Sequence, residues 1–197
     1  MTPLKNKIRK DIINISVAGA AGRMGQMLVK EIKQNPETKL VSATCHHSEK
    51  QLIGKDAGTI AGIESLNVPL VIDPQSLLLS DVIIDFTTPE SSIKHSNLAS
   101  GLGISHVIGT TGFTEEQEEK LKGFSKKIPI VYSANMSVGV NLLIELLGDA
   151  VSKTGVDWDV EILEMHHKYK VDAPSGTALA LGKAAAKARN KNLSDIS

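Results

Sequence analysis

The stretch that decides the fold covers residues 12–25 and reads Ile12-Ile13-Asn14-Ile15-Ser16-Val17-Ala18-Gly19-Ala20-Ala21-Gly22-Arg23-Met24-Gly25. Its first half is rich in β-branched residues and predicts a buried strand, and apolar residues recur at helical spacing after Gly25. In a turn between strand and helix, glycines let the pyrophosphate of a dinucleotide approach the amides of the helix N-terminus. The GxxGxxG spacing is a variant of the commoner GxGxxG and alone is a weak signal, which its strand–helix context strengthens.

Strand and helix patterns alternate along the following residues. Strands are expected near 12–18, 39–45, 69–72, 81–86, 104–108 and 128–133, and helices near 22–34, 74–79, 90–101 and 114–123. This alternation, with continuously apolar strands such as 82–84, predicts an α/β fold in which a Rossmann-like parallel sheet is covered on both faces. The polar stretch 46–62 is expected to form a loop over the sheet edge.

The pattern changes after residue 136. An apolar helical repeat covers 140–151, a strand is expected over 158–166, and a last helix near 177–190. We therefore expect two domains, a dinucleotide-binding Rossmann domain over 1–136 and an α+β substrate-binding and catalytic domain over 137–197.

Composition narrows the classes of partner. Lysine plus arginine and aspartate plus glutamate both number 22, and aromatic residues make up 3% of the chain. A neutral chain with few aromatic residues favours neither nucleic acid nor an anionic membrane surface. No segment approaches the roughly 20 apolar residues that span a bilayer. The basic N-terminus resembles a signal peptide, but Asp11 and Asn14 interrupt the apolar run, so we expect a basic tail. Cys45 is the single cysteine, which fits a cytoplasmic protein.

Four loops follow predicted strands of the first domain. In parallel α/β sheets, ligands bind at the carboxyl ends of the strands. Each loop alone is as well explained by an ordinary turn, but four at one edge predict a cofactor groove. The groove residues are Gly19, Ala20, Ala21, Gly22, Arg23, Met24, Gly25, Phe86, Thr87, Thr88, Gly109, Thr110, Thr111, Ser133, Ala134, Asn135 and Met136.

The segment 166–177 combines proton-transfer groups with an anion site. Histidine exchanges protons near neutral pH, and a lysine or a helix N-terminus can hold a carboxylate. His166, His167 and Lys170 precede Ser175-Gly176-Thr177, where a helix is expected to begin. Simple capping of that helix is compatible with an anion site, because both use the same amides. Adjacent histidines without a cysteine or carboxylate cluster are poor zinc ligands, so no metal is expected.

These motifs, in this order, closely resemble the 4-hydroxy-tetrahydrodipicolinate reductase family, also called dihydrodipicolinate reductase. The resemblance covers almost the whole chain. It is carried by Gly19-Ala20-Ala21-Gly22-Arg23-Met24-Gly25, Asp85-Phe86-Thr87-Thr88-Pro89-Glu90, Gly109-Thr110-Thr111-Gly112-Phe113, Ser133-Ala134-Asn135-Met136-Ser137-Val138-Gly139-Val140-Asn141 and Glu164-Met165-His166-His167-Lys168-Tyr169-Lys170-Val171-Asp172-Ala173-Pro174-Ser175-Gly176-Thr177.

The resemblance implies a reaction and a role for each site. NADPH or NADH would deliver a hydride to C4 of the ring derived from 4-hydroxy-tetrahydrodipicolinate, with loss of water, in lysine and diaminopimelate biosynthesis. The family resemblance assigns the four loops to the cofactor. His166 would be the general acid/base and Lys170 a second proton donor and carboxylate partner. The small dicarboxylate substrate would be bound by His167, Ser175, Gly176, Thr177 and Thr111. Relatives are cytoplasmic homotetramers.

Two departures from the family pattern leave questions open. The second strand ends in Cys45-His46-His47-Ser48-Glu49-Lys50, whereas many relatives carry an acid here, often followed by arginine. Because that acid would bind the ribose hydroxyls of NAD, we expect NADPH to bind at least as well as NADH. Relatives usually continue past Ser197, so we expect an incomplete second domain. The alternatives are another nicotinamide-dependent reductase of an amino or keto acid, and a catalytically silent dinucleotide-binding fragment.

Overall fold

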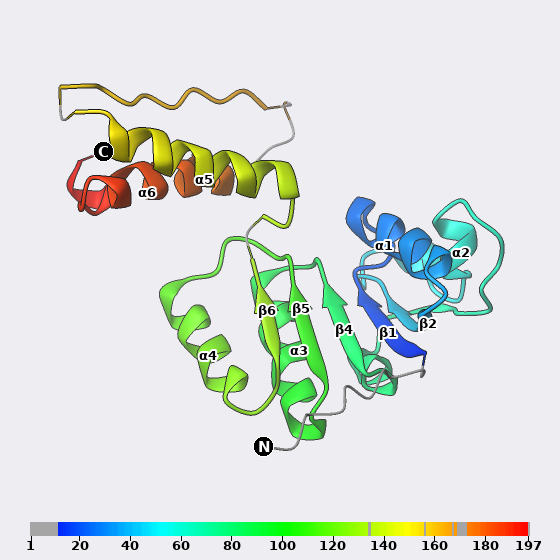
Figure 1. Cartoon of the computed structure of the whole chain (residues 1–197). Coiled ribbons are helices and arrows are strands. Elements are labelled where there is room, and N and C mark those ends of the chain that lie inside the picture. Colours follow the sequence, from blue (N-terminus) through cyan, green and yellow to red (C-terminus); the bar gives the residue numbers. More distant parts are fainter. Residues whose placement is uncertain (1–11, 134, 156, 167, 169–172, 197) are drawn as a thin grey trace, which may run out of the picture. The chain divides into compact units, whose positions relative to one another are not determined.

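The computed structural model describes residues 12–133, 135–155, 157–166, 168 and 173–196 (Figure 1). Two compact units make up the chain, one ending at Tyr132 and the other beginning at Ser133. The expected basic tail falls on residues 1–11, outside the described residues. Among the described residues, no helix has both the length and the apolar character to cross a bilayer.

The first unit is built on a six-stranded parallel sheet. Its strands are β1 (Ile13–Ala18), β2 (Thr38–Thr44), β3 (Leu70–Val71), β4 (Val82–Asp85), β5 (Ser105–Ile108) and β6 (Ile130–Tyr132). Their order across the sheet is β3-β2-β1-β4-β5-β6. The order changes direction between β1 and β4, which is the switch point where α/β sheets bind ligands. The predicted Rossmann-like fold is confirmed.

Helices cover both faces of this sheet. They are α1 (Arg23–Gln34), α2 (Ala57–Ile60), α3 (Pro89–Leu102) and α4 (Glu115–Ser125), with short 3₁₀ turns η1 (Lys50–Leu52) and η2 (Pro74–Leu79). Alternate residues of β1 enter different cores, because side chains of a strand alternate in direction. Ile15 and Val17 pack in one cluster with Val29 of α1, whereas Ala18 packs in another with Leu77 and Ala99.

The stretch 46–62 is more ordered than a loop, so that prediction was partly wrong. It contains η1 and α2. The Asp56 carboxylate caps α2 by accepting from the Thr59 amide at 2.9 Å, and it also accepts from the Leu66 and Val68 amides. A β-carbon on Gly58 would lie 2.2 Å from the Glu64 carbonyl oxygen. A single acid and a glycine therefore fold this polar segment, and neither produces a hydrophobic period.

The second unit contains α5 (Val138–Lys153), α6 (Gly176–Ala188) and the 3₁₀ turn η3 (Leu193–Asp195), and α5 packs against α6. The strand expected over 158–166 is not formed, so that prediction was wrong. The segment runs as extended chain (Figure 1). Its alternation is real: Leu163 and Met165 are 91% and 90% exposed, whereas Ile162 is 40% exposed. A strand also needs a hydrogen-bonding edge, and none of the strands among the described residues forms a ladder with this segment.

Candidate functional site

The glycine turn between β1 and α1 is packed too closely for side chains. Gly19 has a positive φ of 75°, and a β-carbon on it would lie 3.0 Å from the Phe86 carbonyl oxygen. A β-carbon on Gly25 would lie 2.1 Å from the Gly19 carbonyl oxygen. Gly22 is the N-cap of α1, without a side-chain cap, and no acid occupies the first turn. The first amides of α1 therefore lack side-chain acceptors and can receive an anion.

Three of the predicted loops lie together at the carboxyl edge of the sheet. The β-carbon position of Gly19 lies 2.9 Å from the Thr87 methyl group, which joins the loops after β1 and β4. A β-carbon on Gly109 would lie 2.1 Å from the Phe86 ring, which joins the loops after β4 and β5. The fourth loop begins at Ser133, directly after β6 in the chain, and belongs to the second unit.

Exposure separates two kinds of residue within these loops. Ala20, Ala21, Gly25 and Thr110 are buried, so these residues form the interior of the loops. The exposed residues are Gly22, Arg23, Met24, Thr88, Thr111 and Met136. Phe86, Thr87, Gly109, Ser133 and Asn135 are half-buried, and Ala134 lies outside the described residues.

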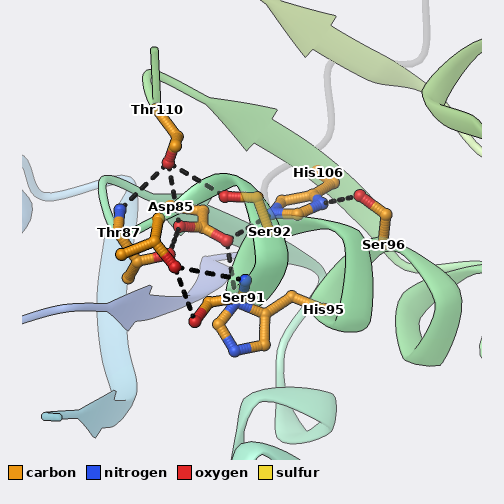
Figure 2. Close-up of polar contacts among 9 residues, drawn as sticks. Asp85, Thr87, Ser91, Ser92, His95, Ser96, His106 and Thr110 are labelled. Carbon is orange, nitrogen blue, oxygen red and sulfur yellow. Dashed lines mark hydrogen bonds and ion pairs between the residues drawn. The ribbon is translucent and has the colours of Figure 1, made fainter. Parts of the chain in front are cut away.

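Sequence reading missed a buried polar network beneath the loops (Figure 2). The carboxylate of Asp85, the last residue of β4, has no exposed surface. Its Oδ2 lies 2.7 Å from Nδ1 of His95 on α3 and 3.3 Å from Nε2 of His106 on β5. Its Oδ1 accepts from the Thr87 hydroxyl at 2.6 Å and from the Thr110 hydroxyl at 3.4 Å. The loops after β4 and β5 thus share one buried acceptor.

The polar groups around Asp85 stabilise its negative charge. Burial alone would raise the pKa of the carboxyl group, but contacts from His106 and His95, together with the Thr87 hydroxyl, hold that pKa well below its usual range. A sequence signal did exist, namely an acid that ends an apolar strand at the ligand edge. On α3, the buried positions Ser92, His95, Ser96 and Ala99 follow helical spacing, but three of them are polar, so no hydrophobic period marks that face.

The loop after β2 carries His46 and His47, at the position where many relatives have the acid that bears on the choice between NADPH and NADH. His46 and His47 are exposed, with ring centroids 3.9 Å apart. The His46 amide donates to Glu49 Oε2 at 2.9 Å, and its ring Nδ1 lies 2.7 Å from the Ser48 hydroxyl oxygen. Burial, followed by the charge of Glu49, raises the pKa of the Cys45 thiol, which fits an inert strand-end residue.

In the second unit, Glu164 connects the histidine segment to the start of α6. The Ser175 amide donates to Glu164 Oε1 at 2.8 Å, and the Ser175 hydroxyl donates to Oε2. Ser175 is 3% exposed, and its hydroxyl oxygen also accepts from the Ala178 amide as the N-cap of α6. Nδ1 of the exposed His166 lies 3.7 Å from Glu164 Oε2.

The other predicted residues of this segment are placed unequally. The Thr177 hydroxyl accepts from the Asn135 side-chain amide at 3.1 Å, so the predicted cofactor loop and the start of α6 meet within this unit. Gly176 opens α6. His167 and Lys170 lie outside the described residues. His166, Ser175 and Thr177 therefore gather around the N-terminus of α6, with Glu164 as an additional member that sequence reading left without a role.

Comparison with known proteins identifies the relatives of this chain. Residues 13–136 match the family described as dihydrodipicolinate reductase, N-terminus, and residues 139–197 match its C-terminus. The 4-hydroxy-tetrahydrodipicolinate reductase of Psychrobacter arcticus is 45% identical over 95% of this chain and 67% of its own length. That of Rhizobium rhizogenes is 48% identical over 95% of this chain and 69% of its own length.

Solved structures agree with these matches. A dipicolinate-bound dihydrodipicolinate reductase from Paenisporosarcina sp. TG-14 superposes with a TM-score of 0.71 at 32% identity, over 90% of this chain and 67% of that one. The resemblance inferred from the motifs is confirmed, and this chain spans about two thirds of the length of these relatives. The chain belongs to the 4-hydroxy-tetrahydrodipicolinate reductase family, the NAD(P)H-dependent oxidoreductases that reduce 4-hydroxy-tetrahydrodipicolinate in lysine and diaminopimelate biosynthesis.

Proposed function

We propose that the loops after β1, β4, β5 and β6 bind the nicotinamide cofactor. The observation that carries this proposal is the uncapped N-terminus of α1 beside glycines that leave no room for a β-carbon. The amides of residues 23 and 24 in the first turn of α1 suit the pyrophosphate, whereas the Gly22 amide donates to the Gly19 carbonyl oxygen at 3.1 Å. The loops after β4 and β5 contribute Phe86, Thr87, Thr88, Gly109, Thr110 and Thr111, and the segment after β6 contributes Ser133, Ala134, Asn135 and Met136. The bound cofactor supplies the hydride, and these residues supply orientation.

The substrate in this proposal is a small dicarboxylate held by residues 137–197, the substrate domain. The Paenisporosarcina relative, whose structure contains dipicolinate, supports this class of ligand. The amides of Gly176 and Thr177 open α6 and suit a carboxylate. His167, Ser175 and Thr111 are the further binding residues. Ser175 already serves as the α6 cap and the partner of Glu164, so it orders the site as well.

Proton transfer falls to the histidine segment. His166 supplies a proton to the departing hydroxyl group, with Lys170 as the second donor. Glu164 lies beside the His166 ring and places a negative charge next to it.

We also infer a cytoplasmic homotetramer from the family resemblance. The exposed Leu142, Leu143 and Leu146 on α5 are apolar surface that a subunit contact would cover, and sedimentation analysis tests this.

The substitution Gly22→Asp tests the cofactor site without loss of folding. Gly22 has an extended backbone, φ −69° and ψ 166°, as N-cap residues do. Aspartate is a favoured N-cap, so the variant should be as stable as the wild type or more stable. Its carboxylate would occupy the α1 amides and repel the pyrophosphate. We expect affinity for both NADPH and NADH to fall at least about 10-fold, by calorimetry.

Gly22→Ala is the matched control, because it adds the same β-carbon without charge. That β-carbon would lie 3.3 Å from the Gly19 carbonyl oxygen, so we expect a small loss of cofactor affinity. The same titrations compare the two cofactors, and we expect the wild type to bind NADPH at least as well as NADH. Wild-type affinity in a folded Gly22→Asp variant would show that the pyrophosphate binds elsewhere.

A further inference from the structure

The Asp85 carboxylate is fully buried, and the proposed cofactor and substrate roles leave it without a function. It is not reached from the surface of the cofactor loops. Burying a charge is costly unless polar groups surround it, so its retention at the ligand edge of the sheet requires an explanation. Its contacts supply one.

Each oxygen of the carboxylate faces a different part of the unit. Oδ1 accepts from the hydroxyls of Thr87 and Thr110, one on each of two proposed cofactor loops. Oδ2 faces His95 Nδ1 at 2.7 Å, and because a carboxylate can only accept, Nδ1 carries the hydrogen. His106 Nε2 lies 3.3 Å from the same oxygen, with its Nδ1 next to the Ser96 hydroxyl at 2.9 Å. Figure 2 shows these groups converging on Asp85 from α3 and β5.

The two threonines are also joined directly. The Thr87 amide donates to the Thr110 hydroxyl oxygen at 3.0 Å, and the Ser92 hydroxyl donates to that oxygen at 2.9 Å. With two bonds accepted, the Thr110 hydroxyl hydrogen is left for Asp85. The Asp85 carbonyl oxygen accepts from the Gly109 amide at 2.9 Å. Asp85 therefore contacts both loops, through its carboxylate and its carbonyl oxygen, beside the direct bond between the two threonines.

We propose that Asp85 is a positioning residue of the reductase, which fixes the loops after β4 and β5 in the register that the cofactor requires. The inference rests on the proposed assignment of the cofactor to these loops. Asp85 touches neither cofactor nor substrate and acts through Thr87 and Thr110. His95 is the support that orients the carboxylate from α3.

The test is cofactor affinity in Asp85→Asn, measured by calorimetry with NADPH. The amide side chain keeps the size of aspartate but cannot accept from Thr87, Thr110 and His95 together. We expect affinity to fall about 10-fold, the effect of losing a hydrogen bond to a charged group. Asp81→Asn is the matched control. Asp81 precedes β4 at the opposite end of the strand and accepts from the Asn14 amide at 2.8 Å, so cofactor affinity should stay unchanged.

A double-mutant cycle and a pair of His95 variants separate positioning from a purely structural role. In a double-mutant cycle, Thr87→Val in the Asp85→Asn background should cost no more than twofold beyond Asp85→Asn alone, because both remove one linkage. His95→Asn retains a donor near Nδ1 and should restore affinity relative to His95→Leu. If Asp85→Asn does not fold, the His95 pair decides the question, because His95 belongs to none of the proposed cofactor loops: His95→Leu should lower affinity, and His95→Asn should lower it less.

The outcomes distinguish the inference from the proposal beneath it. Folded Asp85→Asn and Thr87→Val variants with wild-type affinity for NADPH would overturn the positioning role, whatever their unfolding midpoints. If Gly22→Asp still lowered affinity in that case, the proposed cofactor site would remain supported. Fully additive losses in the cycle would also overturn it. If the wild-type protein bound neither NADPH nor NADH, both the positioning role of Asp85 and the proposed cofactor site would be wrong.

Discussion

His166 and Glu164 lie two residues apart on the same side of an extended segment, and they divide the proposed chemistry between them. His166 is exposed, as a group that must reach substrate should be. Glu164 is half-buried and is hydrogen-bonded to Ser175. One side chain is therefore placed for proton transfer, and its neighbour for holding the start of α6.

Substituting each residue should affect different kinetic constants. We expect His166→Gln to lower kcat by about 10²- to 10⁴-fold, the usual contribution of a general acid or base, with cofactor affinity unchanged. Glu164→Gln should chiefly raise the KM for the dicarboxylate, because it weakens the bonds that order Ser175. Steady-state kinetics at saturating NADPH measure both. Near-normal turnover in His166→Gln would move the proton donor to another residue.

The network around Asp85 shows where prediction from sequence stops at this scale. His95 and His106 lie 10 and 21 positions beyond Asp85 in the sequence, and nothing local links them. The face of α3 that carries His95 is largely polar and buried, which is the reverse of the pattern that identifies a core-facing helix. The position of the loop glycines and threonines at the carboxyl edge of the sheet could be predicted because they follow apolar strands, and strand ends can be predicted from sequence.

At the scale of the element, Asp56 is the residue on which the 56–68 segment depends. Burial would raise its pKa, but the Thr59, Leu66 and Val68 amides outweigh this and lower the pKa to about 2. A carboxyl group with a depressed folded pKa contributes stability above its unfolded pKa, and that contribution is lost as pH falls through the folded value. The contribution of Asp56 should therefore be present at neutral pH and disappear between about pH 4 and pH 2.

The substitution Asp56→Asn should remove that contribution. We expect a loss of about 1 kcal/mol in the free energy of unfolding at pH 7, the typical value of a helix cap. Asp73→Asn is the control, because among the described residues the Asp73 side chain accepts from one amide, that of Gln75, and the loss of stability should be smaller. Urea unfolding at pH 7 and at pH 3 would measure both. The difference between wild type and Asp56→Asn should shrink at the lower pH, and a constant difference would contradict the argument.

Most of the predicted elements match the structure to within about three residues, including α3, which lacks an apolar period and was predicted as 90–101 against Pro89–Leu102 in the structure. The sequence predicted α1 as 22–34, and the structure has Arg23–Gln34. By contrast, α2 depends on one cap and was missed. The strand predicted over 158–166 was wrong for a different reason. Alternation predicts which side chains point the same way, but sheet formation also depends on a strand edge elsewhere in the structure.

For the whole molecule, the two units differ in how their backbones are hydrogen-bonded, and hydrogen exchange should reveal it. In the first unit β1, β4 and β5 each have strand neighbours on both sides, so their amides open only with the unit as a whole. Amides in 158–166 have no strand partner among the described residues. We expect slow exchange in the central strands, intermediate exchange in α5 and α6, and fast exchange across 158–166.

Adding NADPH extends this test to the proposed site. Binding to the folded state adds stability that rises with the logarithm of the ligand concentration over Kd, so it should slow exchange in the glycine turn and in β1, β4 and β5. Gly22→Asp, which should not bind, is the control and should show no slowing. The 158–166 segment should remain fast in every sample. Protection there equal to that of β4 would mean that the segment pairs in solution with an edge that the described residues do not provide.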